Sequence, residues 1–337
     1  MTARRLHDLL GLPRGVLITA SRDPDAKLTF VVTRQLPGAS GSARLVVKIP
    51  VTAVAAESVD REGRMLVDLR RMCTGPLVRT FPRYVQSVVV EQRSALVSTA
   101  LPGAPMSVGY HRWLHTARRS RVTADFRRAE AWLTAFQTDT HLGDKPLTWP
   151  AETEDALRRR WDGHPCLDLA LHRLQVARSH LEGRIAPTTA VHGDFWFGNL
   201  LVFGDAVTGV VDWENGGVTG CPLRDLARFP LSYGLYLDRH TRPGHRVLGH
   251  WGLRRDDFGA GVRYALLGRG WLPCLVRSFL REGLLRLGLP PEHWYDVALV
   301  GIGEVAATAN DEEFGRGHLM LLAGLPDRPP EPGRTRP

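Results

Sequence analysis

Lysine is nearly absent from this sequence of 337 residues: Lys27, Lys48 and Lys145 are three of its 44 basic residues, and the other 41 are arginine. The arginines are spread along the whole chain and interleaved with acids, without a basic block, although the net charge is +9. A nucleic-acid-binding surface concentrates its positive charge on one face or segment. The composition therefore argues against nucleic acid as a partner.

Long apolar runs are also missing. The longest uncharged ones, such as residues 297–303, are far shorter than the roughly 20 residues of a membrane helix. Asp8 and Pro13 interrupt the apolar stretch near the N-terminus, which is not typical of an export signal. The four cysteines are widely scattered, which fits neither a disulfide framework nor a zinc site. We therefore expect a soluble, cytoplasmic protein without a membrane partner.

Short β-branched runs in the first hundred residues predict five strands. They cover residues 16–19, 28–33, 45–49, 88–91 and 95–99. Between the third and fourth runs, apolar residues recur at helical spacing over residues 51–72. This order predicts a small antiparallel sheet into which one helix is inserted.

Helical patterns replace the strands after Pro102-Gly103, notably over residues 126–138 and 167–181. We predict an α+β chain with an N-terminal lobe at 1–101 and a larger, mostly helical C-terminal lobe at 102–325. Residues 326–337 contain five prolines and several arginines and are predicted to be a disordered tail.

The segment from residue 190 to 214 carries the most informative polar residues. Two carboxylates, Asp194 and Asp212, occur there with the amide of Asn199. Phosphoryl transfer requires a carboxylate near the attacking hydroxyl and oxygen ligands for magnesium on the nucleotide. We therefore interpret these three residues as candidates for that chemistry. Taken singly, each aspartate is more typical of a turn or a helix cap.

Strand spacing provides a geometric test of this interpretation. Residues 199–202 and 207–211 predict a hairpin, and a two-residue turn at Asp205-Ala206 would place Asn199 opposite Asp212. A shift of one residue in the turn would move the partner to a neighbour. The register thus predicts that the two side chains share one cation.

The motif His192-Gly193-Asp194, with Asn199 five residues after the aspartate, resembles the catalytic loop of aminoglycoside phosphotransferases and choline kinases. Asp212 is similar to the second metal-binding aspartate of that group. The resemblance implies a bilobal protein kinase-like fold whose C-terminal lobe carries a catalytic β-hairpin. It also implies transfer of the γ-phosphate of ATP, or GTP, to a hydroxyl of a small molecule with Mg²⁺. Asp194 would be the catalytic base, His192 a loop scaffold, and Asn199 and Asp212 the metal ligands.

The same resemblance assigns the nucleotide site to the N-terminal lobe. Lys48, a lone lysine in an apolar strand, would hold the α- and β-phosphates and be held by an acid on the following helix. Glu62 fits that position best because it falls in the apolar stripe of the helix, and Glu57 is the second choice. Residues 97–103 resemble the hinge that meets the adenine, which makes Thr99 and Leu101 candidates.

One feature departs from the family. The connection between the first two predicted strands, residues 20–27, should cover the phosphates but contains no glycine, so only Ser21 is a candidate donor. A glycine-rich stretch occurs one connection later, at residues 38–42. This departure motivates an alternative reading, a catalytically silent kinase-like binding protein. His111 and His115, one helical turn apart, could bind metal but have no third ligand near them in sequence.

Charge gives the only hint about the acceptor. Residues 239–290 hold ten arginines against three acids, whereas residues 291–314 hold six acids and no basic residue other than histidine. The first segment would repel a polycation, and the second would attract one. We expect a neutral or anionic hydroxylated metabolite such as a sugar, with an aminoglycoside as the alternative.

Overall fold

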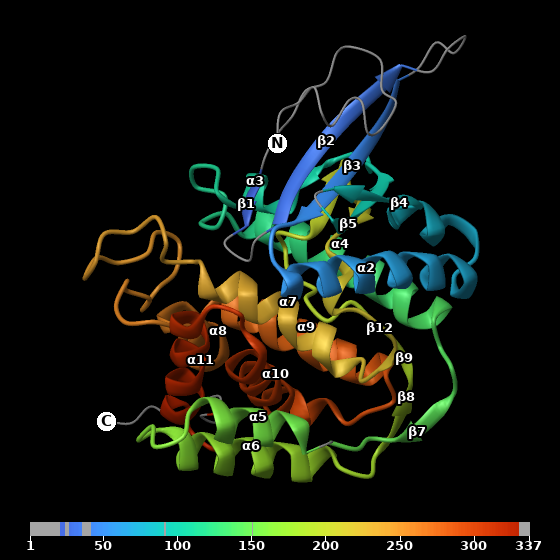
Figure 1. Ribbon diagram of the computed structural model, residues 1–337. Helices are drawn as coiled ribbons and strands as arrows, with labels where there is room; N and C mark the ends of the chain where they lie inside the picture. The colour runs from blue at the N-terminus through green and yellow to red at the C-terminus, as the bar shows by residue number, and fades with distance from the viewer. Residues whose placement is uncertain (1–20, 24–26, 36–41, 91, 150, 330–337) are drawn as a thin grey trace, which may run out of the picture. The chain divides into compact units, whose positions relative to one another are not determined.

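The computed structural model describes residues 21–23, 27–35, 42–90, 92–149 and 151–329 (Figure 1). The chain forms two compact units. The first comprises Met1–Pro105, His192–Asp194 and Asn199–Val218, and the second comprises Met106–Val191, Phe195–Gly198 and Thr219–Pro337. The lobe boundary after residue 101 stays a prediction, and residues 330–337 of the predicted tail lie outside the described residues.

A five-stranded antiparallel sheet forms most of the first unit. Its spatial order is β1 (Ser21–Asp23), β2 (Lys27–Gln35), β3 (Ser42–Pro50), β5 (Arg93–Thr99) and β4 (Tyr84–Val90). Alternate residues of β3 and β5, among them Val47, Ile49 and Val97, are buried in one hydrophobic cluster. Four of the five predicted strands are present at these positions, and the predicted strand at 16–19 lies outside the described residues.

Helix α2 (Ala53–Met72) follows β3, as the spacing predicted. It begins where the Thr52 hydroxyl accepts a hydrogen bond from the backbone N–H of Ala55 at 3.1 Å, which satisfies one free donor of the first turn. Its buried stripe includes Val59, Glu62 and Leu66. A carboxylate in an apolar stripe is costly unless it is paired, so the helix requires a cation opposite Glu62.

Shorter elements complete the first unit. The 3-10 helix η1 (Gly75–Thr80) precedes β4, and the hairpin of β10 (Leu200–Phe203) and β11 (Ala206–Val210) pairs with β6 (Ala104–Pro105). The chain then passes into the 3-10 helix η2 (Trp213–Asn215) and the strand β12 (Gly217–Gly220), of which Gly217 and Val218 belong to this unit and Thr219 and Gly220 to the second. The buried indole of Trp213 packs edge-on against Phe81, with ring centroids 5.4 Å apart.

Helices dominate the second unit. They are α3 (Met106–Tyr110), α4 (Arg119–Asp139), α5 (Glu152–Arg160), α6 (Leu167–Leu181), α7 (Leu223–Leu235), α8 (Ala260–Leu267), α9 (Trp271–Arg286), the 3-10 helix η3 (Pro291–His293), α10 (Trp294–Thr308) and α11 (Glu312–Gly324). Three short strands occur among them, β7 (Asp144–Pro146), β8 (Ile185–Pro187) and β9 (Thr189–Val191). Helix α10 packs against α5, α6, α7 and α11 and is buried over most of its length, which makes it the core helix of this unit.

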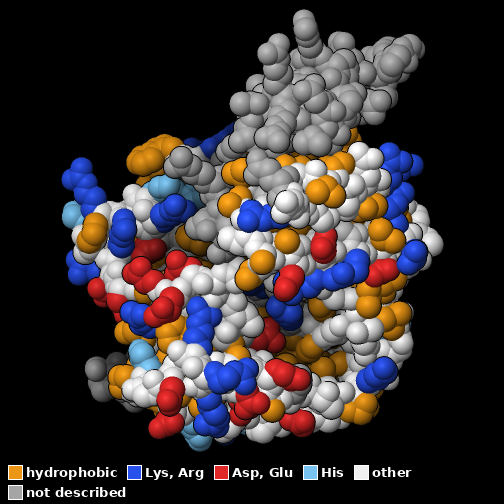
Figure 2. All heavy atoms as spheres, in the orientation of Figure 1, with side chains coloured by type: hydrophobic (Ala, Val, Ile, Leu, Met, Phe, Trp, Pro, Cys, Tyr) orange, Lys and Arg blue, Asp and Glu red, His pale blue; other side chains and the backbone are white. Residues whose placement is uncertain are grey.

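Charges of both signs alternate on the surface of this unit. Helix α5 begins with acids in its first turn and ends with three arginines, an order that suits the helix dipole. Figure 2 shows acidic and basic side chains intermingled over the lower part of the visible face, where α5 and α6 lie in Figure 1. None of the described helices is both long and apolar enough to cross a membrane.

Candidate active site

The loop His192–Asp194 turns sharply at Gly193. Its φ angle is +79°, in the left-handed region, and a Cβ at this position would lie 2.0 Å from the backbone oxygen of Asn215. Only glycine fits both the angle and the contact. The chain that follows the hairpin thus packs directly on the loop that carries Asp194.

His192 braces this loop. Its Nδ1 accepts a hydrogen bond from the backbone N–H of Asp194 at 3.2 Å, which leaves the ring proton on Nε2. Nε2 donates that proton to the backbone oxygen of Val211 at 2.9 Å. The ring is fully buried and lies 4.5 Å from the Trp213 ring, centroid to centroid. One nitrogen therefore braces the loop internally, and the other joins the loop to Val211, directly after β11.

Asn199 reaches back to Asp194 within the same unit. Its side-chain nitrogen donates to the Asp194 backbone oxygen at 3.0 Å and to the carboxylate Oδ2 at 3.3 Å. Because the nitrogen is occupied in this way, the amide oxygen of Asn199 is the atom that a cation would use. Asn199 is 4% exposed, so this orientation is fixed by its surroundings.

The predicted hairpin register was wrong by one residue. The turn is at Gly204-Asp205, not at Asp205-Ala206, and a bulge between Leu201 and Val202 moves the register on by one. The backbone N–H of Val211 donates to the oxygen of Asn199 at 3.1 Å, so Asn199 lies opposite Val211. Gly204 permits the earlier turn because its φ angle of +60° suits glycine.

Asp212 follows as the first residue beyond the hairpin. Its φ angle is +64° and its ψ angle +59°, a left-handed conformation that is uncommon for a residue with a side chain. Strained backbone of this kind is concentrated at functional sites. The kink ends the strand, and the Asp212 side chain is 47% exposed beside the buried head of Lys48.

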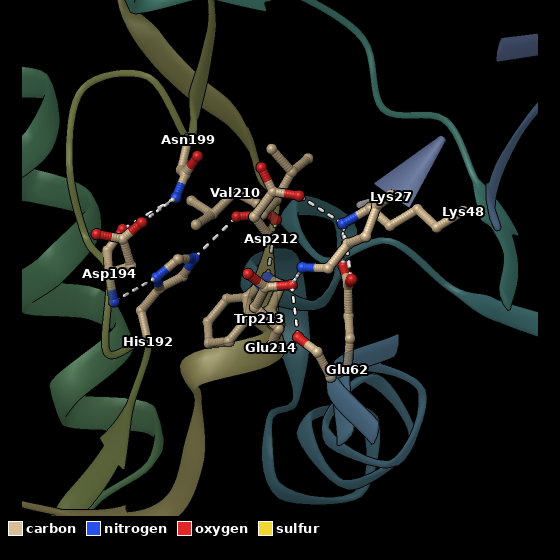
Figure 3. Close-up of polar contacts among 12 residues, drawn as sticks. Lys27, Lys48, Glu62, His192, Asp194, Asn199, Val210, Asp212, Trp213 and Glu214 are labelled. Atoms are coloured by element: carbon tan, nitrogen blue, oxygen red, sulfur yellow. Dashed lines mark hydrogen bonds and ion pairs between the residues drawn. The ribbon is translucent and has the colours of Figure 1, made fainter. Parts of the chain in front are cut away.

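Lys48 is the centre of a buried ion-pair network. The side chain points from β3 to Glu62 on α2, and its Nζ lies 2.7 and 2.6 Å from the two carboxylate oxygens. It also contacts Oδ1 of Asp212, which is 164 positions away in the sequence. Figure 3 shows Lys48 between the two acids. Glu62 rather than Glu57 is the acid that contacts Lys48.

The network explains how a lysine is kept charged inside the protein. Burial alone would lower the pKa of Lys48, but Asp212 and Glu62 outweigh burial and raise the pKa above its usual value. The reverse holds for Asp212. Desolvation would raise the pKa of its carboxyl, yet the charge and the hydrogen bond of Lys48, assisted by His192, lower it. Both groups are therefore ionised at neutral pH.

A second buried lysine was not foreseen from the sequence. Lys27 is 6% exposed at the start of β2 and forms an ion pair with Oε2 of Glu214. The same oxygen accepts a hydrogen bond from the Ser58 hydroxyl of α2 at 2.9 Å. The signal was available in the sequence, because Lys27 is one of only three lysines and starts an apolar strand.

The predicted hinge residues are held against the hairpin. The Thr99 backbone N–H donates to the Arg83 oxygen at 2.9 Å, so that donor is already used. Leu101 packs on Gly209 of β11, where a Cβ would approach the Leu101 side chain to 2.7 Å. Contact of Thr99 and Leu101 with a nucleotide base stays a prediction. Ser21 belongs to β1, and its side chain lies outside what the structure describes.

The two histidines considered as a metal pair have different partners. His115 Nε2 lies 2.7 Å from Oδ2 of the buried Asp125, whereas His111 Nδ1 lies 2.9 Å from Nε2 of His240. Tyr233 donates its hydroxyl proton to the same Asp125 oxygen at 2.9 Å. His115 is thus part of a polar cluster in the core of the second unit.

The fold and the geometry around Lys48 and Asp194 define a protein kinase-like enzyme. Residues 30–259 match the sequence model of the phosphotransferase enzyme family, APH, and the chain belongs to this family. Membership confirms the predicted enzyme class, a small-molecule kinase with an alcohol group as acceptor. No curated protein matches the sequence significantly.

Solved structures show the same fold. A crystal structure of aminoglycoside phosphotransferase APH(4)-Ia superimposes with a TM-score of 0.57 and 13% identity, covering 96% of this chain and 98% of that one. The streptomycin-ATP-APH(2")-IIa ternary complex gives a TM-score of 0.53 and 12% identity, covering 96% of this chain and 95% of that one. These similarities confirm the predicted α+β, protein kinase-like fold.

Proposed function

We propose that this chain transfers the γ-phosphate of ATP to a hydroxyl of a neutral or anionic small molecule, with Asp194 as catalytic base and Mg²⁺ held by Asn199 and Asp212. The observation that carries the proposal is the Lys48–Glu62–Asp212 network together with the Asn199–Asp194 contact, both of which lie within one compact unit. GTP is the alternative donor.

The residues fit a magnesium ion. Mg²⁺ takes oxygen ligands and is bound in nucleotide enzymes by one or two carboxylates plus phosphates. The amide oxygen of Asn199 and the half-exposed carboxylate of Asp212 are donors of that kind. When held by these residues, the ion would supply positive charge that neutralises the charge of the nucleotide phosphates. The left-handed conformation of Asp212 supports this role, because it turns the carboxylate out of the strand.

Asp194 would act on the acceptor. Its carboxylate accepts the proton of the acceptor hydroxyl as the hydroxyl oxygen bonds to the γ-phosphorus and the bond between that phosphorus and the β,γ-bridging oxygen breaks. The products are the phosphorylated acceptor and ADP. The hydrogen bond from Asn199 orients the carboxylate and keeps one of its oxygens engaged. His192 holds the loop through the two backbone contacts described above.

Lys48 would contribute a fixed positive charge for the α- and β-phosphates. A lysine that remains protonated in a dry site provides electrostatic stabilisation without rearrangement during the reaction. The pKa shift of Lys48 supports this, since Glu62 and Asp212 raise it. Lys27 contributes a second positive charge to the same unit, and Glu214 partly neutralises it.

The acids of the second unit support a neutral or anionic acceptor. In the acidic segment 291–314, Asp311 caps helix α11 and Glu312 binds Arg316 at 2.6 Å. Glu304 lies 3.8 Å from Arg224, and Asp296 contacts two histidines. Acids engaged in this way contribute little to binding a polycation. The solved relatives include complexes with hygromycin B, gentamicin and streptomycin, so aminoglycosides remain the alternative acceptor class.

The experiment is a phosphate-transfer assay on the purified chain. We would combine Mg²⁺ and γ-labelled ATP or GTP with sugars, sugar acids, nucleosides, amino alcohols and aminoglycosides. The variant Asp194→Asn is tested beside Asp205→Asn, which changes an exposed aspartate in the turn between β10 and β11. We expect label transfer to a neutral or anionic class, loss of transfer in Asp194→Asn, and full activity in Asp205→Asn.

Two outcomes would contradict the proposal. Saturable turnover of aminoglycosides in preference to the other classes overturns the acceptor assignment. Absence of transfer together with absence of Mg²⁺-dependent nucleotide binding overturns the kinase assignment and favours the catalytically silent binding protein.

A further inference from the structure

Two histidines and an aspartate meet in the second unit, and the proposed phosphotransfer chemistry uses none of them. His180 lies in the last turn of α6, His293 ends η3, and Asp296 lies in the first turn of α10. One nitrogen of each histidine and one oxygen of the aspartate lie within 4.8 Å of one another. Two chain segments, the end of α6 and the continuous stretch from η3 into α10, thus bring ligand atoms to one point.

Hydrogen bonds already orient this cluster. His293 Nδ1 lies 2.9 Å from Asp296 Oδ2, and His180 Nδ1 lies 3.2 Å from Asp296 Oδ1. The side chains of His293 and Asp296 are 16% and 13% exposed, while that of His180 is 41% exposed. His293 and Asp296 are therefore held in place by packing, and His180 lies on the solvent side of the cluster.

We propose that His180, His293 and Asp296 form a binding site for a divalent transition metal, with Zn²⁺ as its preferred ion. Imidazole nitrogens and a carboxylate are the ligands that Zn²⁺ takes in proteins, whereas Mg²⁺ prefers oxygen ligands alone. Three protein ligands leave a coordination position for water. The C-terminal end of α6, which carries a partial negative charge, adds a favourable field for the cation.

Arg184 competes with the metal. Its Nη2 lies 2.9 Å from Nε2 of His293, and its Nε donates to the His180 backbone oxygen at 2.7 Å. Because guanidinium only donates, Nε2 of His293 must present its lone pair and the ring proton must be on Nδ1. A metal at Nδ1 requires the proton to move to Nε2, and Arg184 must then withdraw from that nitrogen. Arg184 therefore weakens the site without closing it.

A bound metal ion would connect helices α6 and α10. Helices α6 and α10 pack against each other (Figure 1), and the three ligands join the end of the first helix to the start of the second. An ion that binds the folded chain and not the unfolded one raises the melting temperature, and the stabilisation grows with the logarithm of the ion concentration above Kd. The site would thus stabilise the core helix α10 in a zinc-dependent way.

The test measures Zn²⁺ affinity of the full-length chain by calorimetry, and Co²⁺ binding by its visible absorption. We expect one ion per chain and a higher melting temperature in Zn²⁺. His293→Ala and Asp296→Asn should each weaken binding by roughly tenfold or more, the scale on which site residues act. Arg184→Gln should tighten binding by roughly tenfold, because glutamine offers an oxygen to the Nε2–H of His293.

Matched controls separate this site from general histidine chemistry. His172→Ala changes an exposed histidine two turns earlier on α6, and His141→Ala changes a histidine that pairs with Asp144 alone. Both should bind Zn²⁺ like the original chain. Equal affinity in His293→Ala and the original chain would overturn the site, and weaker binding by Arg184→Gln would overturn the competition by Arg184. Neither outcome depends on phosphate transfer.

Discussion

The side-chain nitrogen of Asn199 donates to both the backbone oxygen and the carboxylate of Asp194, at 3.0 and 3.3 Å. One residue therefore links the loop that carries the proposed base to the hairpin that carries the proposed metal ligands. The two roles of Asn199 use different atoms, nitrogen for Asp194 and oxygen for a cation. Substitutions can separate them.

Asn199→Ala removes both roles, whereas Asn199→Asp keeps an oxygen ligand and loses the donor to Asp194. We expect Asn199→Ala to lower kcat by roughly 10²- to 10³-fold, the scale on which a single electrostatic contact of this kind acts. The Mg²⁺ concentration at half-maximal rate should rise in the alanine variant and stay closer to its original value in the aspartate variant. Steady-state kinetics over a Mg²⁺ series measure both. Equal Mg²⁺ dependence in the two variants would argue against a metal-binding oxygen at this position.

Glu62→Gln removes one of the two carboxylates that contact Lys48. We expect a higher KM for ATP and a loss of about 1 to 3 kcal/mol in the free energy of unfolding, because the buried ammonium keeps only Asp212 as a charged partner. Urea denaturation and ATP titration measure the two effects. Glu57→Gln is the control, since Glu57 is exposed on the same helix. If Glu62→Gln and Glu57→Gln change the KM for ATP and the free energy of unfolding equally, Glu62 does not hold Lys48 for nucleotide binding.

Gly193 and Gly204 share a left-handed backbone conformation but differ in the atoms that an added Cβ would contact, so Gly193→Ala and Gly204→Ala form a matched pair. Both glycines have positive φ angles, +79° and +60°, but a Cβ at Gly193 meets the Asn215 oxygen whereas at Gly204 no heavy atom lies within 4 Å. The backbone angle alone costs about 1 to 2 kcal/mol, which is the expected loss in Gly204→Ala. Gly193→Ala should lose more stability and most activity, because the loop must move. Thermal denaturation with activity assays distinguishes them, and similar losses would contradict the described contact.

Acid should destabilise the second unit through two buried histidines. Burial lowers the pKa of His318 and of His250 to about 4 in each case, from 6.5. In the unfolded chain each histidine binds a proton below about pH 6.5, whereas in the folded chain it binds one only near pH 4. The free energy of unfolding is therefore highest above pH 6.5 and falls as the pH approaches 4. The loss approaches about 3 kcal/mol for each histidine at the lower end.

Urea denaturation at pH 7 and pH 5 tests this effect. His318→Gln cannot titrate, so its stability should change less between the two pH values than that of the original chain. His172→Gln, at an exposed position of α6, is the control and should keep the original slope. A slope that is unchanged in His318→Gln would assign the acid sensitivity to other groups.

The sequence predicted the elements whose residues repeat with a clear period. The strands β2 to β5, helix α2, and helix α6 at its observed bounds follow from apolar spacing, since burial on one face imposes that spacing, whereas β1 lies in residues predicted to be a connection. Glu62 could be chosen over Glu57 on the same ground, because it lies in the buried stripe. The roles of these residues stay predictions.

The hairpin register and the second lysine pair could not be obtained in this way. The turn begins one residue early, which moves each partner by two positions, and the bulge moves it back by one; nothing in the local sequence of Leu201 and Val202 signals the bulge. The contact between Lys27 and Glu214 joins positions far apart in the chain, and single-sequence patterns report only local order. The partners of such charges become visible only in three dimensions.

The first unit combines segments that are far apart in the sequence, and this affects how it folds during synthesis. The segment Asn199–Val218 belongs to the same unit as the N-terminal sheet, although the ribosome synthesises it about a hundred residues later. Until Asp212 emerges, the ammonium of Lys48 has Glu62 but not Asp212 of the two acids described above, and β6 lacks β10, the strand with which it pairs. In the N-terminal part of a nascent chain, Lys48 therefore stays incompletely neutralised until the segment Met106–Val191 of the second unit has been translated.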